Sequence, residues 1–255
     1  MASSFYWYDL ETSGTDPKWD RMVQVAGLRT DQDLNILGDE LCTYVRLGED
    51  VLLNPDASLV TGIMPETLQR EGIPEVQAWE EIMRRFTVPE TCVVGYNSLR
   101  FDDEFVRYGL YRHLFDPYAR EWQSGCSRWD LIDLVRASGA LRREGINWPQ
   151  DEDGLPVYKL EELTKANDIG HSNAHDALAD VHATNSMHSL HATAGGSGER
   201  WWRWDYRRVF SIYPLPIFPL RTCWVFVMQN LSHYFSFLQI YYYQTLSLIH
   251  ISEPT

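Results

Sequence analysis

Two carboxylates, Asp9 and Glu11, lie two residues apart in the stretch YWYDLET, which is otherwise apolar and aromatic. The side chains of a β-strand alternate between its faces with a period of two, so this spacing predicts that both acids share one face. Like charges on a half-buried strand repel each other, and they persist only around a cation or at an edge in water. Cation binding and an exposed edge-strand pair are therefore the two interpretations of this stretch.

Three further residues could take part in the same chemistry. Asp102 starts a predicted helix after VVGYNSLRF, and HDALAD contains His175 and Asp180 near the start of a late helix. A spacing of five residues turns a helix by about 140°, so His175 is expected in the lead-in and Asp180 one turn inside, which suits two different roles. Each also has an ordinary interpretation, with Asp102 stabilising a helix N-terminus and His175 lying on the surface. The neighbouring Asp103 and Glu104 are expected to act on the helix dipole only.

The elements that must position these residues form an α/β pattern. Three strands in succession open the chain, and a short, wholly apolar run later is typical of a strand buried on both faces. The strands are predicted at residues 4–11, 21–30, 40–47 and 91–96. A turn and a short helix are predicted within 59–72, and longer helices at 74–86, 101–114, 127–141, 159–168 and 174–190. This order predicts a mixed sheet with helices on both sides.

Two helices carry more detailed expectations. Pro65 suits the first position of the short helix, because its missing N–H has no helical partner there. The helix at 74–86 is amphipathic and is expected to bury one face. That face would contain Val76, Trp79, Ile82, Met83 and Phe86.

Length and composition limit the class of protein. A chain of 255 residues can hold one large domain or two small ones. Its net charge of −14 argues against a broadly basic nucleic-acid surface, although a metal-dependent nuclease concentrates acid at its centre. The four cysteines have no metal-site spacing and the N-terminus has no secretory pattern, so a reduced, cytoplasmic protein is expected.

The composition changes sharply near HATAGGSGER. Residues 1–192 read as one α/β domain, whereas residues 193–255 contain 15 of the 34 aromatic residues, no lysine and no clear periodicity. A membrane anchor and a second domain are two interpretations, but polar residues interrupt any apolar span of roughly 20 residues. We interpret this segment as an out-of-frame or artefactual, poorly ordered tail, because the ending LSLIHISEPT resembles translated adapter sequence.

In their order, the acidic motifs resemble those of the DEDD exonuclease superfamily, the branch with a histidine base and a ribonuclease-H-like fold. The strings TCVVGYNSLRFDDEFVRYGLYR, DPYAREWQSGCSRWDLIDLVRA, LRREGINWPQDEDGLPVYKLEELTKAN and HSNAHDALADVHAT closely resemble the bacterial exodeoxyribonuclease I family. The resemblance runs from about residue 4 to about residue 190 and includes the loops.

The resemblance implies a two-metal hydrolysis of phosphodiesters with Mg²⁺, for which Mn²⁺ could substitute. Asp9 would bridge the two ions, Glu11 and Asp180 would complete the nearer site, and Asp102 would hold the second ion through water. His175 would accept the proton of the attacking water, and Glu11 is counted with it as catalytic.

The resemblance also implies contacts to single-stranded DNA. The matching positions are Arg107, Tyr118, Trp122, Arg136 and Lys159, where Lys159 replaces the arginine more common in the family. Without the family, core packing would be an alternative for Tyr118 and Trp122, and a plain surface charge for Arg107.

The expected function is therefore 3′→5′ hydrolysis of single-stranded DNA to 5′-mononucleotides by a monomer. Members of the family continue into an SH3-like and a helical domain, which nothing after residue 192 resembles. Docking to single-strand-binding protein is therefore not expected of this chain. Two alternatives remain open: a related exonuclease that acts on RNA or in proofreading, and an inactive fragment that at most binds single strands.

Overall fold

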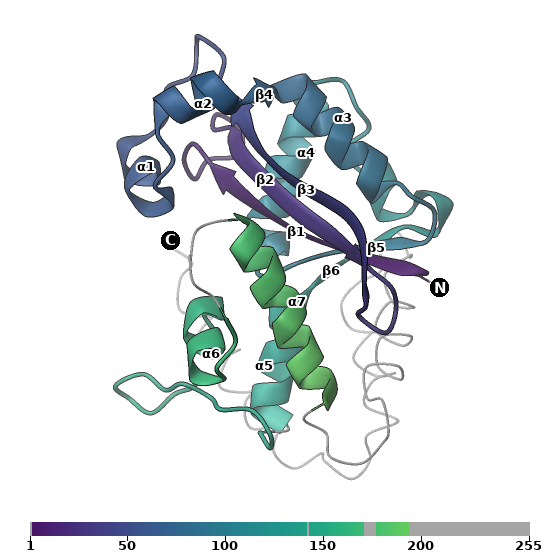
Figure 1. Ribbon diagram of the computed structural model, residues 1–255, viewed down its shortest axis with the longest axis vertical. Coiled ribbons are helices and arrows are strands. Elements are labelled where there is room, and N and C mark those ends of the chain that lie inside the picture. Colours follow the sequence, from purple (N-terminus) through teal and green to yellow (C-terminus); the bar gives the residue numbers. More distant parts are fainter. Residues whose placement is uncertain (1, 142, 171–176, 194–255) are drawn as a thin grey trace, which may run out of the picture. The chain divides into compact units, whose positions relative to one another are not determined.

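The computed structural model describes residues 2–141, 143–170 and 177–193, and its centre is a six-stranded sheet (Figure 1). The strands lie in the order β4-β3-β2-β1-β5-β6. Their bounds are β1 Ser4–Thr12, β2 Met22–Thr30, β3 Ile36–Arg46, β4 Ile73–Pro74, β5 Thr91–Gly95 and β6 Ser127–Asp130. The first three strands pair antiparallel, whereas β5 is parallel to β1 and β6 is parallel to β5. The predicted α/β fold with a mixed sheet is confirmed.

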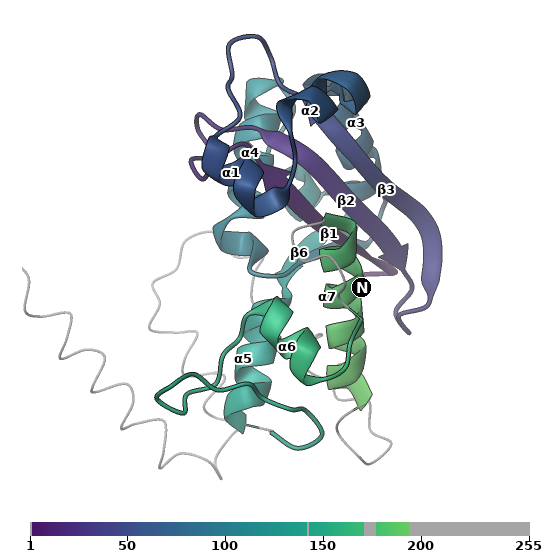
Figure 2. The ribbon, with the colours of Figure 1, turned by 60° about the vertical axis from the view of Figure 1, so that its left-hand side comes forward.

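Helices cover both faces of this sheet (Figures 1 and 2). α3 and α4 pack on one face, α7 crosses β1 and β2 on the other, and α5 and α6 lie beside α7. The helices are α1 Pro55–Thr61, α2 Pro65–Glu71, α3 Glu75–Phe86, α4 Asp102–Arg112, α5 Leu131–Leu141, α6 Leu160–Ala166 and α7 Ala177–Thr193. Single 3-10 turns occur at Ser98–Arg100, Ala119–Glu121 and Gln123–Gly125.

The side chains of β1 alternate between the two helical layers. The ring of Tyr8 lies 5.0 Å from that of Phe86 in α3, and the ring of Trp7 lies 5.4 Å from that of His188 in α7. Even-numbered residues of this strand therefore build the core under α3 and α4, and odd-numbered residues face α7. The two acids of β1 are odd-numbered, so they lie on the α7 side.

β1 extends beyond its parallel neighbour. β5 pairs with Ser4–Trp7 only, whereas β2 pairs with β1 as far as Thr12. Past Trp7, one edge of β1 is therefore open at the carboxyl end of β5, and it is at such ends of α/β sheets that binding sites assemble.

The amphipathic helix α3 contributes much of the core. Trp79, Ile82 and Phe86 are each 1% exposed, and burial of such a side chain stabilises the fold by roughly 2–3 kcal/mol. Val76 is 43% exposed, so its predicted burial was wrong. At 100° per residue it lies at the margin of the stripe that these three residues define, and it belongs to the first turn. Met83 lies at the same margin of the stripe and is partly buried against the core.

The predicted helix at 127–141 begins later than expected. Ser127–Asp130 form β6, which pairs with β5 from Cys92↔Ser127 to Gly95↔Asp130, and α5 starts at Leu131. A four-residue strand is too short to show a period of its own, so pairing with the neighbouring strand decides its conformation.

Local signals explain α1 and α2, of which only α2 was predicted. The side chain of Asn54 accepts the backbone N–H of Asp56 and caps α1, Pro55 is in its first turn, and Gly62 ends it at φ 71°. Pro65 begins α2, as expected. β3 begins four residues before its predicted start, at Ile36.

Some expectations fall on other parts of the chain. His175 and the tail after residue 193 lie outside the described residues, so the proposed division at residue 192 stays a prediction. Cys42, Cys92 and Cys126 are free thiols. Within the part of the chain that the structure describes, no helix is long and apolar enough to cross a membrane.

Candidate active site

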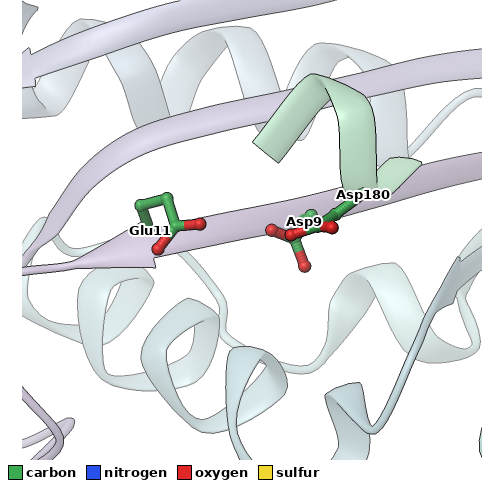
Figure 3. Close-up of side chains that lie close together, drawn as sticks. All are labelled: Asp9, Glu11 and Asp180. Atoms are coloured by element: carbon green, nitrogen blue, oxygen red, sulfur yellow. The ribbon is translucent and has the colours of Figure 1, made fainter. Parts of the chain in front are cut away.

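Three carboxylates converge beside the open edge of β1. Asp9 and Glu11 come from this strand, and Asp180 comes from the first turn of α7, which crosses it (Figure 3). One carboxylate oxygen of each lies within 4.8 Å of the other two, and all three side chains are half-buried. The strand's period of two and one helical crossing thus bring together residues that are 170 positions apart.

This arrangement is electrostatically unfavourable without a cation. The pKa of Asp9 is raised well above its usual value by burial first, and then by the charges of Asp102, Asp180 and Glu11. At an effective dielectric constant of about 20, two unit charges some 5 Å apart repel by about 3 kcal/mol. A divalent cation would turn that repulsion into attraction, and carboxylate oxygens are the ligands that Mg²⁺ and Mn²⁺ prefer.

Asp102 joins the group from another direction. It is the first residue of α4 and only 5% exposed. Burial first, and then the charge of Asp103, raises the pKa of Asp102, whereas the backbone amide of Leu10 in β1 acts to lower the pKa of this carboxyl. Asp102 therefore lies next to the trio without being one of the three residues within 4.8 Å of each other.

The loop that leads to Asp102 is fixed by Asp130, the last residue of β6. Its carboxylate accepts the backbone N–H of Asn97 at 2.7 Å and that of Leu99 at 3.1 Å, and it also accepts that of Ile132 at 3.2 Å. Asn97 has the left-handed conformation, with φ 59°. Sequence patterns do not indicate this role, because Asp130 lies inside the helix predicted at 127–141.

Asp103 lies in the first turn of α4, where it was expected to act on the helix dipole, and it also has partners that the sequence did not reveal. It is 1% exposed, and its carboxylate binds Arg120 at 2.7 Å and Arg128 at 2.5 Å. Tyr8 donates its hydroxyl to the same carboxylate at 2.9 Å. Burial alone would raise the pKa of Asp103, but the two guanidinium groups hold it below its usual value. Glu104, its neighbour, pairs with Arg107.

The predicted strand contacts on one side cluster around Arg107. Tyr118 is 55% exposed and Trp122 66% exposed, so core packing does not explain either ring. The guanidinium of Arg107 lies 5.5 Å from the ring centre of Tyr118 and also pairs with Glu104 and, at 3.1 Å, with Glu121. Arg107 is thus held by protein groups on several sides.

Arg136 and Lys159 lie near the end of β5. Arg136 is partly exposed on α5, 3.8 Å from Asp133, and its charge acts to lower the pKa of Tyr96. The Tyr96 hydroxyl donates to the backbone oxygen of Tyr158, the residue before the exposed Lys159. Tyr96, directly after β5, is thus linked both to Arg136 and to the segment that carries Lys159.

The structure thus groups Asp9, Glu11, Asp102 and Asp180, and it describes each of the five predicted strand contacts. The roles of these residues remain predictions. Sequence reasoning missed Asp103 and Asp130 as parts of the site's support. The Asp102–Asp103 doublet was a weak signal, because successive residues of a helix point in directions about 100° apart and so meet different surroundings.

Comparison with known proteins is consistent with this geometry. The exonuclease family model (RNase_T) matches residues 6–186. Exodeoxyribonuclease I of Haemophilus influenzae is 51% identical over 187 residues, which are 73% of this chain and 40% of that protein. The oligoribonuclease of Mycobacterium bovis is 30% identical over 198 residues, which cover 71% of this chain and 76% of that protein.

Solved structures give the same picture. Escherichia coli exonuclease I in complex with a dA16 oligonucleotide superposes with a TM-score of 0.74 at 50% identity, covering 76% of this chain and 41% of that one. The chain spans about two fifths of the length of these exonuclease I relatives. The ribonuclease-H-like exonuclease fold is confirmed. The chain belongs to the exonuclease family, and its exonuclease domain is about half identical in sequence to exodeoxyribonuclease I.

Proposed function

We propose that this chain is a metal-dependent 3′→5′ exonuclease that hydrolyses single-stranded DNA to 5′-mononucleotides. The observation that carries the proposal is the convergence of Asp9, Glu11 and Asp180 within 4.8 Å, with the charge of Asp102 acting on the same group. An acidic centre of this kind suits two Mg²⁺ ions, with Mn²⁺ as a substitute.

The chain's own residues would divide the work. Asp9 and Asp102 would hold one ion between them, and Asp9, Glu11 and Asp180 the other. Bound divalent ions lower the pKa of water and stabilise a leaving 3′-oxygen. His175 would accept the proton from the attacking water, for which a pKa near neutrality is suitable.

Local groups would bind the strand despite the net charge of −14. Tyr118 and Trp122 expose rings on which bases can stack without regard to sequence. Arg136 and Lys159 would neutralise phosphates on the other side. In solved structures the relatives carry DNA oligonucleotides, and one is described with single-strand-binding protein and an inhibitor. We propose that this chain acts on single-stranded DNA, as a monomer, in the cytoplasm.

One observation favours a second candidate, an exonuclease that acts on short RNA. The chain covers 76% of the Mycobacterium bovis oligoribonuclease but only 40% of Haemophilus influenzae exodeoxyribonuclease I. An inactive fragment that only binds strands is the third possibility.

One experiment separates these candidates. The full chain is incubated with Mg²⁺ and with end-labelled oligomers of single-stranded DNA, duplex DNA and RNA, and Asp9→Ala serves as the control. Release of 5′-mononucleotides from single-stranded DNA by the wild type alone supports the proposal. Faster release from RNA would favour the second candidate, and equal, background-level release by both proteins would leave only strand binding.

A further inference from the structure

A continuous set of ion pairs joins the candidate metal ligand Asp102 to the predicted strand contacts. We call this set the Asp103 network: Asp103, Arg107, Arg120, Glu121 and Arg128. Asp103 adjoins Asp102 in the first turn of α4, and Glu121 lies between Tyr118 and Trp122 in the chain. Three segments far apart in the sequence meet here, namely α4, the turn Ala119–Glu121 and β6.

The links can be followed one by one. Asp103 accepts from Arg120 at 2.7 Å and from Arg128 at 2.5 Å. Arg128 also binds Glu121 at 3.1 Å, and Glu121 binds Arg107 at 3.1 Å. The guanidinium of Arg107 then lies against the ring of Tyr118. Every link is buried or half-buried, which weakens solvent screening and strengthens the geometric constraint.

A second connection fixes the network to the strand that carries the acids. Tyr8 precedes Asp9 in β1, and its hydroxyl donates to Asp103 at 2.9 Å. On the other side of the same helix turn, Asp102 is only 5% exposed and lies beside the acidic site, where its charge acts on Asp9. The first turn of α4 therefore presents two adjacent carboxylates, Asp102 to the acidic site and Asp103 to the arginines and to Tyr8 of β1.

The charges of the three arginines at this network are balanced by carboxylates of the protein. Arg107, Arg120 and Arg128 face three carboxylates, those of Asp103, Glu121 and Glu104, so little positive charge is left for a phosphate. Arg107 suits support of the Tyr118 ring better than direct capture of DNA.

We propose that the Asp103 network is a positioning device that holds the metal ligand Asp102 and the strand-contact segment Tyr118–Trp122 in fixed relation to each other. The proposal rests on the proposed function, since it takes Asp102 as a ligand and the segment as a contact for single strands. Tyr8 and Asp103 position the end of the network next to Asp102, which we call the metal end. Glu121 and Arg107 position the end next to Tyr118–Trp122, which we call the strand end, and Arg128 contacts both ends.

Near-isosteric variants separate the two ends. Tyr8→Phe removes one bond to Asp103, and Glu121→Gln weakens the link between Arg128 and Arg107. Arg128→Met cuts both, and Arg84→Met, which breaks an exposed pair with Glu81 on α3, is the matched control. Affinity for Mn²⁺ alone is measured by titration, affinity for a labelled dT oligomer in Ca²⁺ by fluorescence anisotropy, and kcat and KM in Mg²⁺.

The expected pattern is a split between readouts. Tyr8→Phe lowers kcat and Mn²⁺ affinity by up to about tenfold and leaves oligomer affinity unchanged, since a bond to a charged group is lost. Glu121→Gln weakens oligomer binding and raises KM about three- to tenfold with kcat retained. Arg128→Met lowers kcat and Mn²⁺ affinity and also weakens oligomer binding, whereas Arg84→Met leaves all of these values unchanged.

Other results overturn the proposal. Wild-type values in both Tyr8→Phe and Glu121→Gln would exclude the positioning role, and so would parallel losses in all readouts that follow the drop in Tm, which indicate general destabilisation. If Arg128→Met does not fold, the first two variants still decide. A wild type that binds Mn²⁺ and oligomer but releases no nucleotide contradicts the proposed function, and the two binding readouts then test the network alone. Absence of Mn²⁺ and oligomer binding in the wild type contradicts both.

Discussion

Two groups of acids lie on opposite sides of the first turn of α4, and they differ in the charges that surround them. On one side Asp9, Glu11 and Asp180 crowd together, and the charges of Asp102, Asp180 and Glu11 add to burial in raising the pKa of Asp9. On the other side Asp103 contacts two guanidinium groups and a hydroxyl. Burial opposes charge in both places, yet the pKa of Asp9 is raised and that of Asp103 is lowered.

The comparison shows how a buried acid can be interpreted. An acid whose charge is balanced within the chain stabilises the fold, and its loss leaves buried cations without a partner. An acid that is crowded by other acids costs stability in the isolated chain, and such acids are retained where they bind a ligand or take part in a reaction. Opposite effects of mutation on stability and on activity should therefore distinguish the two groups.

The largest effect is expected for Asp9→Ala. If Asp9 is a shared metal ligand, as proposed, its loss removes several kcal/mol of transition-state stabilisation, and nucleotide release should fall on the order of 10³-fold or more. The same change relieves repulsion, so the Tm in EDTA should rise or stay unchanged. Activity assays and thermal unfolding on the same preparation check both, and a clear fall of the Tm in EDTA would place Asp9 with the structural acids.

Arg120→Met should show the reverse on the other side. Arg120 is fully buried and binds Asp103, so its removal leaves a buried carboxylate with one guanidinium fewer. Breaking a buried pair in this way costs about 3–5 kcal/mol. Urea unfolding should show this loss, with Arg84→Met within about 0.5 kcal/mol of the wild type as the exposed control. A neutral Arg120→Met would mean that the network contributes little to stability.

The sequence allowed a better prediction of the first group of acids than of the second. Period-two spacing was enough to place Asp9 and Glu11 on one face, because a strand's geometry is local. The convergence with Asp180 depended on the resemblance, since no local rule decides which helix crosses which strand. Asp103 was expected to act on the helix dipole, and its ion pairs were missed because its partners, Arg120 and Arg128, come from a turn and a strand that periodicity does not reveal. The order of the longer elements was predictable, because a long periodic segment shows whether it is a helix or a strand. β6 was missed because the conformation of a four-residue strand depends on the strand with which it pairs.

A smaller effect is expected where the network meets the strand. Trp122→Ala removes an exposed ring, so stability should change little, while stacking of one base is worth about 1–3 kcal/mol. KM for single-stranded DNA should therefore rise by roughly five- to a hundredfold with kcat nearly unchanged. Trp19→Ala, at a ring that is 76% exposed and not a predicted contact, is the control. Equal KM values for the two variants would remove Trp122 from the strand-contact surface.

The smallest effect is expected from a change of pH, which should shift the Tm by on the order of a few degrees. The two groups of acids should respond to pH in opposite directions. Asp9 and Asp102 have pKa values above those of the unfolded chain, so the folded state binds their protons more tightly. Their contribution is present at acid pH and is lost as the pH rises through their folded pKa values. Asp103, with a lowered pKa, contributes above the unfolded value near 4 and loses that contribution as the pH falls. In EDTA the Tm should thus fall both toward pH 8 and below about pH 4.

Added Mg²⁺ should cancel only the alkaline fall, because a cation replaces the protons at the acidic site and leaves the Asp103 network untouched. Asp9→Asn should flatten the alkaline limb and Asp103→Asn the acid limb; a Mg²⁺ effect that is equal at both ends would contradict the assignment of the two groups.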